Sequence, residues 1–294
     1  ANFDEIEGIK SWGMLDDVTT NPSLIKESGA KDMEEHIKRI CDVVGEGNSV
    51  SLEVISLDSE SMVKEAHILH DKFNYIAGNV TVKIPISTST KYNEWNEEGI
   101  KAIEALYKDG IRVNATLIFT PKQAIRAAMA GASYVSPFLG RLDDYLRENL
   151  LGWKMVKEKP GEREFTKSSY YPAEGMLNEK EELVNDNGIV SGVHLGLIIV
   201  DNLKELGYDT KVIAASLRNR RQVSEVRQTG VDVATIPYSV IKEIHENGFE
   251  EIEKLNLPKY ELKKDENSLY HPKTVEGVIR FTVDVVPEYR DLFK

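Results

Sequence analysis

Short apolar segments typical of β-strands alternate with amphipathic helical segments along most of this 294-residue chain. The strand-like segments are rich in Val, Ile and Thr, whereas the helical segments repeat an apolar residue at every third or fourth position. Strands are expected within 15–25 and at 49–55, 80–86, 112–119, 133–141, 211–216 and 232–237. Helices are expected at 3–12, 32–44, 59–73, 97–108, 121–130, 193–206, 219–228, 239–246 and 272–284. This alternation predicts an α/β fold in which crossover helices join parallel strands.

The spacing of the expected strands distinguishes two architectures of this class. Repeats of roughly 20 to 35 residues favour a (β/α)8 TIM barrel over a doubly wound sheet. No Gly-x-Gly-x-x-Gly follows any expected strand, which argues against a dinucleotide-binding sheet. We therefore predict a single barrel domain over residues 1–294.

Two charged stretches interrupt the alternation. Residues 151–190 are rich in turn-forming residues and have little apolar periodicity, and residues 249–270 have the same character. A segment of this kind inside a compact domain is more often an insertion or a lid than a core element. We predict insertions at 151–190, after the strand at 133–141, and at 249–270.

Composition excludes several classes of protein. The formal net charge of −12 argues against a nucleic-acid-binding or anionic-membrane-binding surface. The sequence contains no run of about 18 apolar residues, the length of a membrane span. A single cysteine, Cys41, cannot form an internal disulfide and fits a reducing, cytoplasmic location.

One lysine stands out within the β-branched segment at 80–86. Alternate residues of a strand face opposite ways, so Lys83 points away from the face shared by Val82 and Ile84. Enclosure by a fold disfavours the charged form of an amine and can make it a nucleophile at neutral pH. A lone lysine more often reaches solvent, so this interpretation depends on its neighbours.

Polar residues recur at the carboxyl ends of successive expected strands, where active groups of barrels gather. Each could be a satisfied buried polar group, but six strands ending this way favour one shared pocket. The residues concerned are Thr19, Asn21, Glu53, Lys83, Asn114, Thr116, Ser136, Arg141, Ser216 and Arg218.

Five motifs at these positions resemble the transaldolase family, which includes the fructose-6-phosphate aldolases. The resemblance covers most of the chain outside 151–190 and 249–270. It implies a barrel of class I aldolase type with no metal and no organic cofactor. The motifs are Val-Thr-Thr-Asn-Pro-Ser-Leu-Ile (18–25), Val-Lys-Ile-Pro (82–85), Asn-Ala-Thr-Leu-Ile-Phe (114–119), Ser-Pro-Phe-Leu-Gly-Arg (136–141) and Ala-Ala-Ser-Leu-Arg-Asn (214–219).

The resemblance also implies roles for individual residues. Lys83 matches the Schiff-base lysine, and Glu53 with Thr116 matches the pair that positions a water for imine formation and hydrolysis. A carboxylate and a hydroxyl that hold one water can shuttle protons. The substrate-binding matches are Thr19, Asn21, Asn114 and Ser136 for sugar hydroxyls and Arg141, Ser216 and Arg218 for phosphate.

Two positions choose between activities within the family. Its aldolases typically have glutamine where Glu53 stands and tyrosine where Phe138 stands, so both residues follow the transaldolase pattern. We expect transfer of a dihydroxyacetone unit from sedoheptulose 7-phosphate to glyceraldehyde 3-phosphate, giving erythrose 4-phosphate and fructose 6-phosphate, in the pentose phosphate pathway. The alternatives are an aldolase and a non-catalytic sugar-phosphate-binding protein. The family resemblance also implies a homo-oligomer.

The N-terminal region departs from the family pattern. The family's first strand ends in Leu-Asp-Thr just before the stretch that resembles 1–6, and its aspartate handles the proton of the hydroxyl at the cleaved bond. Asp4 is a poor substitute, because it belongs to the following helix. We therefore expect the sequence to begin after the first barrel strand.

Overall fold

The computed structural model describes residues 2–261 and 269–294. The chain forms two compact units. The first unit comprises Ala1–Leu117, Arg126–Val135 and Tyr270–Lys294, and the second comprises Ile118–Ile125 and Ser136–Leu269. Strands β4 and β5 and helix α6 each cross the boundary, so both units hold parts of these elements.

The first unit is built on parallel strands. β1 (Val18–Thr19), β2 (Val50–Glu53), β3 (Val80–Pro85) and β4 (Val113–Ile118) pair in this order, and every residue of β2, β3 and β4 is buried. Strands covered on both faces are typical of α/β folds and explain the continuous β-branched runs. The helices of this unit are α1 (Phe3–Ser11), α2 (Pro22–Ser28), α3 (Met33–Val44), α4 (Ser59–Ala77), α5 (Glu98–Lys108), α11 (Pro272–Asp284) and α12 (Pro287–Arg290).

Helix α4 is central to the packing of the first unit. It contacts β3 as well as α3 and α5, and it buries Met62, Leu69 and Phe73 completely. Helix α11 packs against α2. The C-terminal segment therefore belongs to the same core as the N-terminal half of the chain.

The second unit continues the alternation of strands and helices. β5 (Tyr134–Pro137) starts in the first unit, and in the second its end bonds to the segment after β8 (Lys211–Ala214), which pairs in parallel with β9 (Val233–Ala234). A short two-stranded pair, β6 (Lys154–Met155) with β7 (Glu164–Phe165), lies outside this sheet. The helices are α7 (Leu139–Tyr145), a π-helix (Leu146–Leu150), α8 (Gly192–Glu205), α9 (Arg220–Val226) and α10 (Tyr238–Asn247), with α6 (Pro121–Met129) shared between units.

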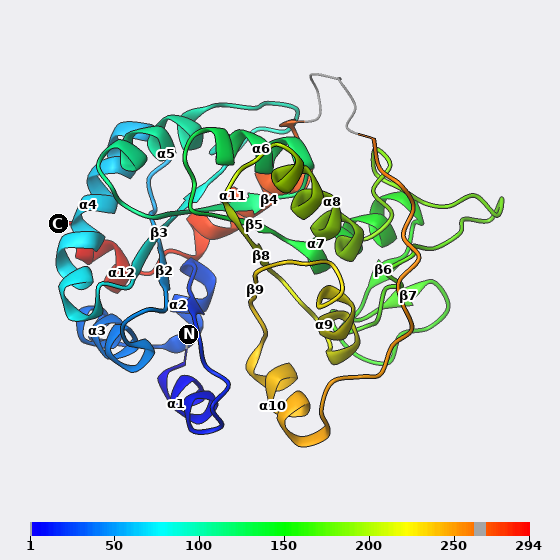
Figure 1. The fold of residues 1–294 in the computed structure, drawn as a ribbon, viewed down its shortest axis with the longest axis horizontal. Coiled ribbons are helices and arrows are strands. Elements are labelled where there is room, and N and C mark those ends of the chain that lie inside the picture. Colours follow the sequence, from blue (N-terminus) through cyan, green and yellow to red (C-terminus); the bar gives the residue numbers. More distant parts are fainter. Residues whose placement is uncertain (1, 262–268) are drawn as a thin grey trace. The chain divides into compact units, whose positions relative to one another are not determined.

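The predicted fold class is confirmed. Within residues 2–261 and 269–294, one seven-stranded sheet with the order β1-β2-β3-β4-β5-β8-β9 alternates with helices along the chain, an arrangement of the TIM-barrel type (Figure 1). The single barrel domain over 1–294 and its two insertions stay predictions. Residues 249–261 contain no helix or strand, and 262–268 of the second predicted insertion lie outside the described residues.

Two of the differences from the expected elements have a clear local cause. The strand expected at 133–141 ends at Pro137, because a helix begins at Leu139. The segment 15–25, in which a strand is expected, continues as helix α2, for which Asn21 is the N-cap and Pro22 the first residue. Both signals favour a helix start, and the sequence prediction overlooked them.

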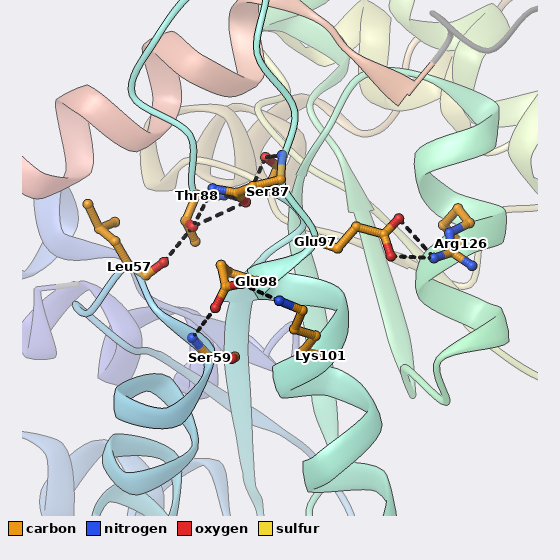
Figure 2. Close-up of polar contacts among 9 residues, drawn as sticks. Leu57, Ser59, Ser87, Thr88, Glu97, Glu98, Lys101 and Arg126 are labelled. Carbon is orange, nitrogen blue, oxygen red and sulfur yellow. Dashed lines mark hydrogen bonds and ion pairs between the residues drawn. The ribbon is translucent and has the colours of Figure 1, made fainter.

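Polar contacts fix the loop that follows β3 (Figure 2). The Asn96 side-chain oxygen accepts from Thr88 N at 3.0 Å, and Thr88 Oγ1 donates to Leu57 O at 2.6 Å. Glu98, at the start of α5, accepts from Ser59 N at 2.8 Å near the start of α4. These contacts hold the end of the strand that carries the candidate lysine.

Candidate active site

Strands β2 and β3 place Glu53 and Lys83 at partnered positions of their parallel ladder. The Lys83 Nζ lies 2.9 Å from Glu53 Oε2, and the two side chains are only 5% and 1% exposed. Nζ also donates to the Thr20 carbonyl at 2.8 Å. The lysine is therefore enclosed, against the usual expectation for a lone lysine, and its amine has a carboxylate within bonding distance.

Burial controls the electrostatics of this pair. Loss of hydration raises the pKa of Glu53, and the Lys83 ammonium offsets part of that rise. A carboxylate whose pKa is raised accepts a proton more readily than an ordinary glutamate does. The pair can therefore supply both a nucleophile and a general acid or base.

Two polar residues of β4 are partnered with residues of β3, the strand that carries Lys83. Asn114 is partnered with Lys83, and its Nδ2 donates to Ser51 Oγ at 3.2 Å. Thr116 is partnered with Pro85, two residues along the same strand. Among residues 2–261 and 269–294, the buried Thr116 Oγ1 has no hydrogen-bond partner. That hydroxyl is available to a water or a substrate atom.

The backbone of β4 has an unusual conformation directly after Thr116. Leu117 is completely buried and has a φ of 60°, in the left-handed region that few non-glycine residues adopt. Thr274 Oγ1 donates to the Leu117 carbonyl at 3.0 Å. Helix α11 therefore holds this turn of the strand in place.

Thr19 and Asn21, both predicted to contact the substrate, lie in different elements of the structure. Thr19 is partnered with Ser51 and is half-buried on β1. The Asn21 side-chain oxygen accepts from Leu24 N at 2.9 Å and caps α2. The structure thus gives Asn21 a local structural role, and its contact with substrate stays a prediction.

The C-terminal helices contribute residues that the sequence analysis missed. Tyr289 Oη donates to the Glu53 carbonyl at 2.7 Å, and the Phe281 ring centroid lies 6.0 Å from Lys83 Nζ. Phe281 and Glu53 line a common hollow of the first unit. Neither contact has a sequence signal, because one partner is a backbone carbonyl and the other an apolar residue of an ordinary helical pattern.

In the second unit, Arg141 lies against aromatic rings. Its guanidinium carbon is 5.7 Å from the Phe119 ring and 5.8 Å from the Phe138 ring, and the two ring centroids are 5.9 Å apart. Such rings hold a guanidinium through cation–π attraction. Ser136, also predicted for the site, is buried at the end of β5.

Two motifs of the second unit meet closely. A Cβ built on Gly140 would lie 2.3 Å from Ser216 O and 2.5 Å from Arg218 Nε, so only glycine fits there. Arg218 Nη2 donates to Asp144 Oδ2 at 2.7 Å. Ser216 has a φ of 64°, so the turn after β8 is strained at a residue predicted to bind phosphate. The second unit therefore brings Phe138, Arg141, Ser216 and Arg218 into neighbouring segments.

Groups of three or more His, Cys, Asp or Glu side chains that could hold a metal are absent from residues 2–261 and 269–294. In the same part of the chain, no helix has both the length and the apolar character that crossing a bilayer requires.

The chain is similar to known proteins over most of its length. The family described as transaldolase/fructose-6-phosphate aldolase matches residues 1–289. A protein of Methanococcus vannielii named probable transaldolase is 37% identical over 252 residues, which cover 86% of this chain and 90% of that protein. Probable transaldolases of Hydrogenobaculum sp. (strain Y04AAS1) and Thermodesulfovibrio yellowstonii are each 39% identical, over 82% and 83% of this chain and 84% and 86% of those proteins. The chain belongs to the transaldolase/fructose-6-phosphate aldolase family and is an enzyme of that family.

Proposed function

We propose that this enzyme is a transaldolase that transfers a dihydroxyacetone unit between sugar phosphates through a Schiff base on Lys83. The observation that carries the proposal is the buried contact of 2.9 Å between Lys83 Nζ and Glu53 Oε2. An enclosed amine beside a carboxylate of raised pKa suits attack on a ketone.

The reaction begins with proton transfer from Lys83 to Glu53. The neutral amine attacks the ketone carbon of the ketose phosphate, and Glu53 returns a proton as water leaves and the iminium forms. The iminium then draws the electron pair of the bond between the third and fourth carbons. The hydroxyl on the fourth carbon gives its proton to a base, the role that the family resemblance assigns to the first-strand aspartate, and becomes the carbonyl of the released aldose phosphate. In this scheme Glu53 and Thr116, whose hydroxyl has no hydrogen-bond partner among the described residues, hold the water that is expelled and later returns for hydrolysis.

Substrate recognition divides between hydroxyls and phosphate. Thr19, Asn21, Asn114 and Ser136 are proposed to hydrogen-bond the sugar hydroxyls. Arg141, Ser216 and Arg218 are proposed to bind the phosphate, for which the planar guanidinium fork is suited. In a chain whose net charge is −12, these arginines would supply the local positive charge that a phosphate needs.

Phe138 favours transfer over release of dihydroxyacetone. Its ring packs against Phe119 and carries no hydroxyl that could activate water. The three-carbon adduct is therefore expected to persist until an aldose phosphate accepts it. We propose that this reaction belongs to the pentose phosphate pathway. We also propose that the enzyme is cytoplasmic and forms a homo-oligomer.

The test is intact-mass measurement after borohydride treatment of the protein with fructose 6-phosphate. We expect a three-carbon adduct on Lys83 that disappears when erythrose 4-phosphate is added before reduction. Lys83→Met should abolish the adduct, and Lys91→Met, at an exposed lysine, should retain it.

Three other outcomes contradict the proposal. Steady release of dihydroxyacetone without an acceptor indicates an aldolase. Binding of fructose 6-phosphate without an adduct indicates a sugar-phosphate-binding protein. An adduct that survives in Lys83→Met places the chemistry on another residue.

A further inference from the structure

Four charged side chains are buried together in the second unit. Asp143, Asp144 and Arg147 are almost fully enclosed, and Arg218 is only 13% exposed. All four line one small hollow. Burying charges costs free energy even when they are paired, so such a cluster is weak evidence for a purely stabilising role.

Within this cluster, Arg218 is held at both its side chain and its backbone. Asp144 Oδ2 accepts from Nη2 at 2.7 Å, and the Arg218 backbone N donates to Gln222 Oε1 at 2.9 Å. Gln222 Nε2 in turn donates to Asp143 Oδ2 at 2.8 Å. Asp144 therefore holds the guanidinium of Arg218 directly, and Asp143 holds its backbone N–H through Gln222. Both carboxylates lie on α7, far from Arg218 in sequence.

The side-chain contact fixes the direction of the guanidinium. Nε lies against Gly140, where even a Cβ would come within 2.5 Å, and Nη2 is taken by Asp144. Asp144 takes one of the donors of the fork, and among the described residues the buried Nε makes no hydrogen bond. The donors that Asp144 does not take are those that can bind an anion.

We propose that Asp144 is a positioning residue for Arg218, which it orients for the phosphate group of the substrate. The inference rests on the proposed function, since that function makes Arg218 a phosphate ligand. A guanidinium already oriented loses less conformational freedom on binding, which favours affinity. The negative charge of Asp144 acts in the opposite direction by attenuating the field of Arg218.

Two substitutions separate orientation from charge. Asp144→Asn keeps the shape and an oxygen acceptor but removes the charge. Asp144→Glu keeps the charge but moves the oxygens by one methylene group and so displaces the guanidinium. If orientation dominates, the dissociation constant of phosphate for Asp144→Asn should lie within about threefold of the native value. For Asp144→Glu it should rise about tenfold, a change of about 1.4 kcal/mol in binding free energy. Where the longer side chain prevents folding, Asp144→Ala gives the same loss of orientation without added volume.

The first readout is the dissociation constant of inorganic phosphate, measured by calorimetry on the full chain. The second compares kcat and KM for fructose 6-phosphate with those for unphosphorylated fructose. We expect Asp144→Glu or Asp144→Ala to raise the KM for fructose 6-phosphate about tenfold with kcat within about twofold, and to leave fructose unaffected. Asp209→Ala, at an exposed position of the same unit, is the control and should match the native chain.

Several results overturn the inference. Tighter phosphate binding by Asp144→Asn shows that the charge of Asp144 competes with phosphate. Equal losses with fructose 6-phosphate and fructose show a general structural defect. If the native chain does not bind phosphate, Arg218 is not a phosphate ligand and Asp144 cannot position it for one. A native chain that binds phosphate but forms no Lys83 adduct instead refutes the proposed function, and the phosphate measurements still decide the role of Asp144.

Discussion

The Lys83 ammonium and the Glu53 carboxylate meet at 2.9 Å on neighbouring parallel strands, in a site that excludes nearly all solvent. Their contact follows from strand register, because the two residues are partnered in the ladder. A shift of one residue would send one of the side chains to the opposite face of the sheet. The register of the fully buried strands β2 and β3 therefore sets the contact on which the proposed chemistry depends.

Glu53→Gln tests whether the carboxylate transfers protons. The amide keeps an oxygen that can accept from Lys83 but cannot take up a proton, so kcat should fall by about 10² to 10⁴. Because burial raises the pKa of Glu53, the acidic limb of the native kcat profile should lie above the ordinary value of 4.5. The measurement is kcat against pH for both proteins. An unchanged kcat and acidic limb in the variant would show that Glu53 has no role in proton transfer.

Tyr289→Phe tests the support that the C-terminus gives to Glu53. The variant removes the hydroxyl that donates to the Glu53 carbonyl at 2.7 Å, and the aromatic ring stays in place. A buried carbonyl without its donor costs about 1 to 3 kcal/mol, so the free energy of unfolding should fall by this amount. Urea denaturation provides the measurement, and kcat should also fall several-fold. Tyr75→Phe, at a residue that is 72% exposed, should change neither quantity, and equal effects at the two positions would refute the argument.

The sequence predicts the parts of this structure that depend on local pattern. Apolar residues that recur at every second position locate most strands, and those that recur at every third or fourth position locate most helices. The β-branched run around Lys83 identifies its strand. The contacts of Lys83 with Thr20 and of Tyr289 with Glu53 were not predictable, because backbone carbonyls carry no sequence signal. The Asp144 contact with Arg218 joins residues 74 positions apart, so only the tertiary fold reveals it.

Gly140→Ala tests the close approach of the two motifs of the second unit. The added Cβ would lie 2.3 Å from the Ser216 carbonyl oxygen, so the backbone must shift. We expect a loss of about 1 to 3 kcal/mol in the free energy of unfolding, as for other overpacked sites, and a raised KM for fructose 6-phosphate.

Gly196→Ala is the matched control for this substitution. Gly196 also lies in a helix, but its added Cβ would meet only side-chain atoms at 3.7 Å or more. Ala is favoured over Gly in a helix by about 0.5 to 1 kcal/mol, so this variant should be as stable as the native chain or slightly more so. Equal destabilisation by both substitutions would show that the helices, and not the contact with Ser216, determine the effect.

Asp143 should make stability depend on pH in a defined window. Burial raises its pKa to about 7 from an ordinary value of 3.8, although the Gly192 N–H and the charge of Arg147 act in the opposite direction. Between these two values the folded chain holds a proton that the unfolded chain has released, so the contribution of Asp143 to stability falls as pH rises from about 4 to about 7.

Asp143→Asn isolates this contribution from those of other groups. The amide does not titrate, so the free energy of unfolding of the native chain relative to the variant should decline across the same window and level off above it. The measurement is urea denaturation of both proteins from pH 4 to pH 8, within the range that the pKa shift defines. Glu98, whose pKa is lowered to about 2 by Lys101 and Ser59, affects stability only below this window and is common to both proteins. A relative stability that rises with pH between about 4 and 7 would mean that the donors around Asp143 outweigh its desolvation, and that its carboxylate is stabilised by the fold.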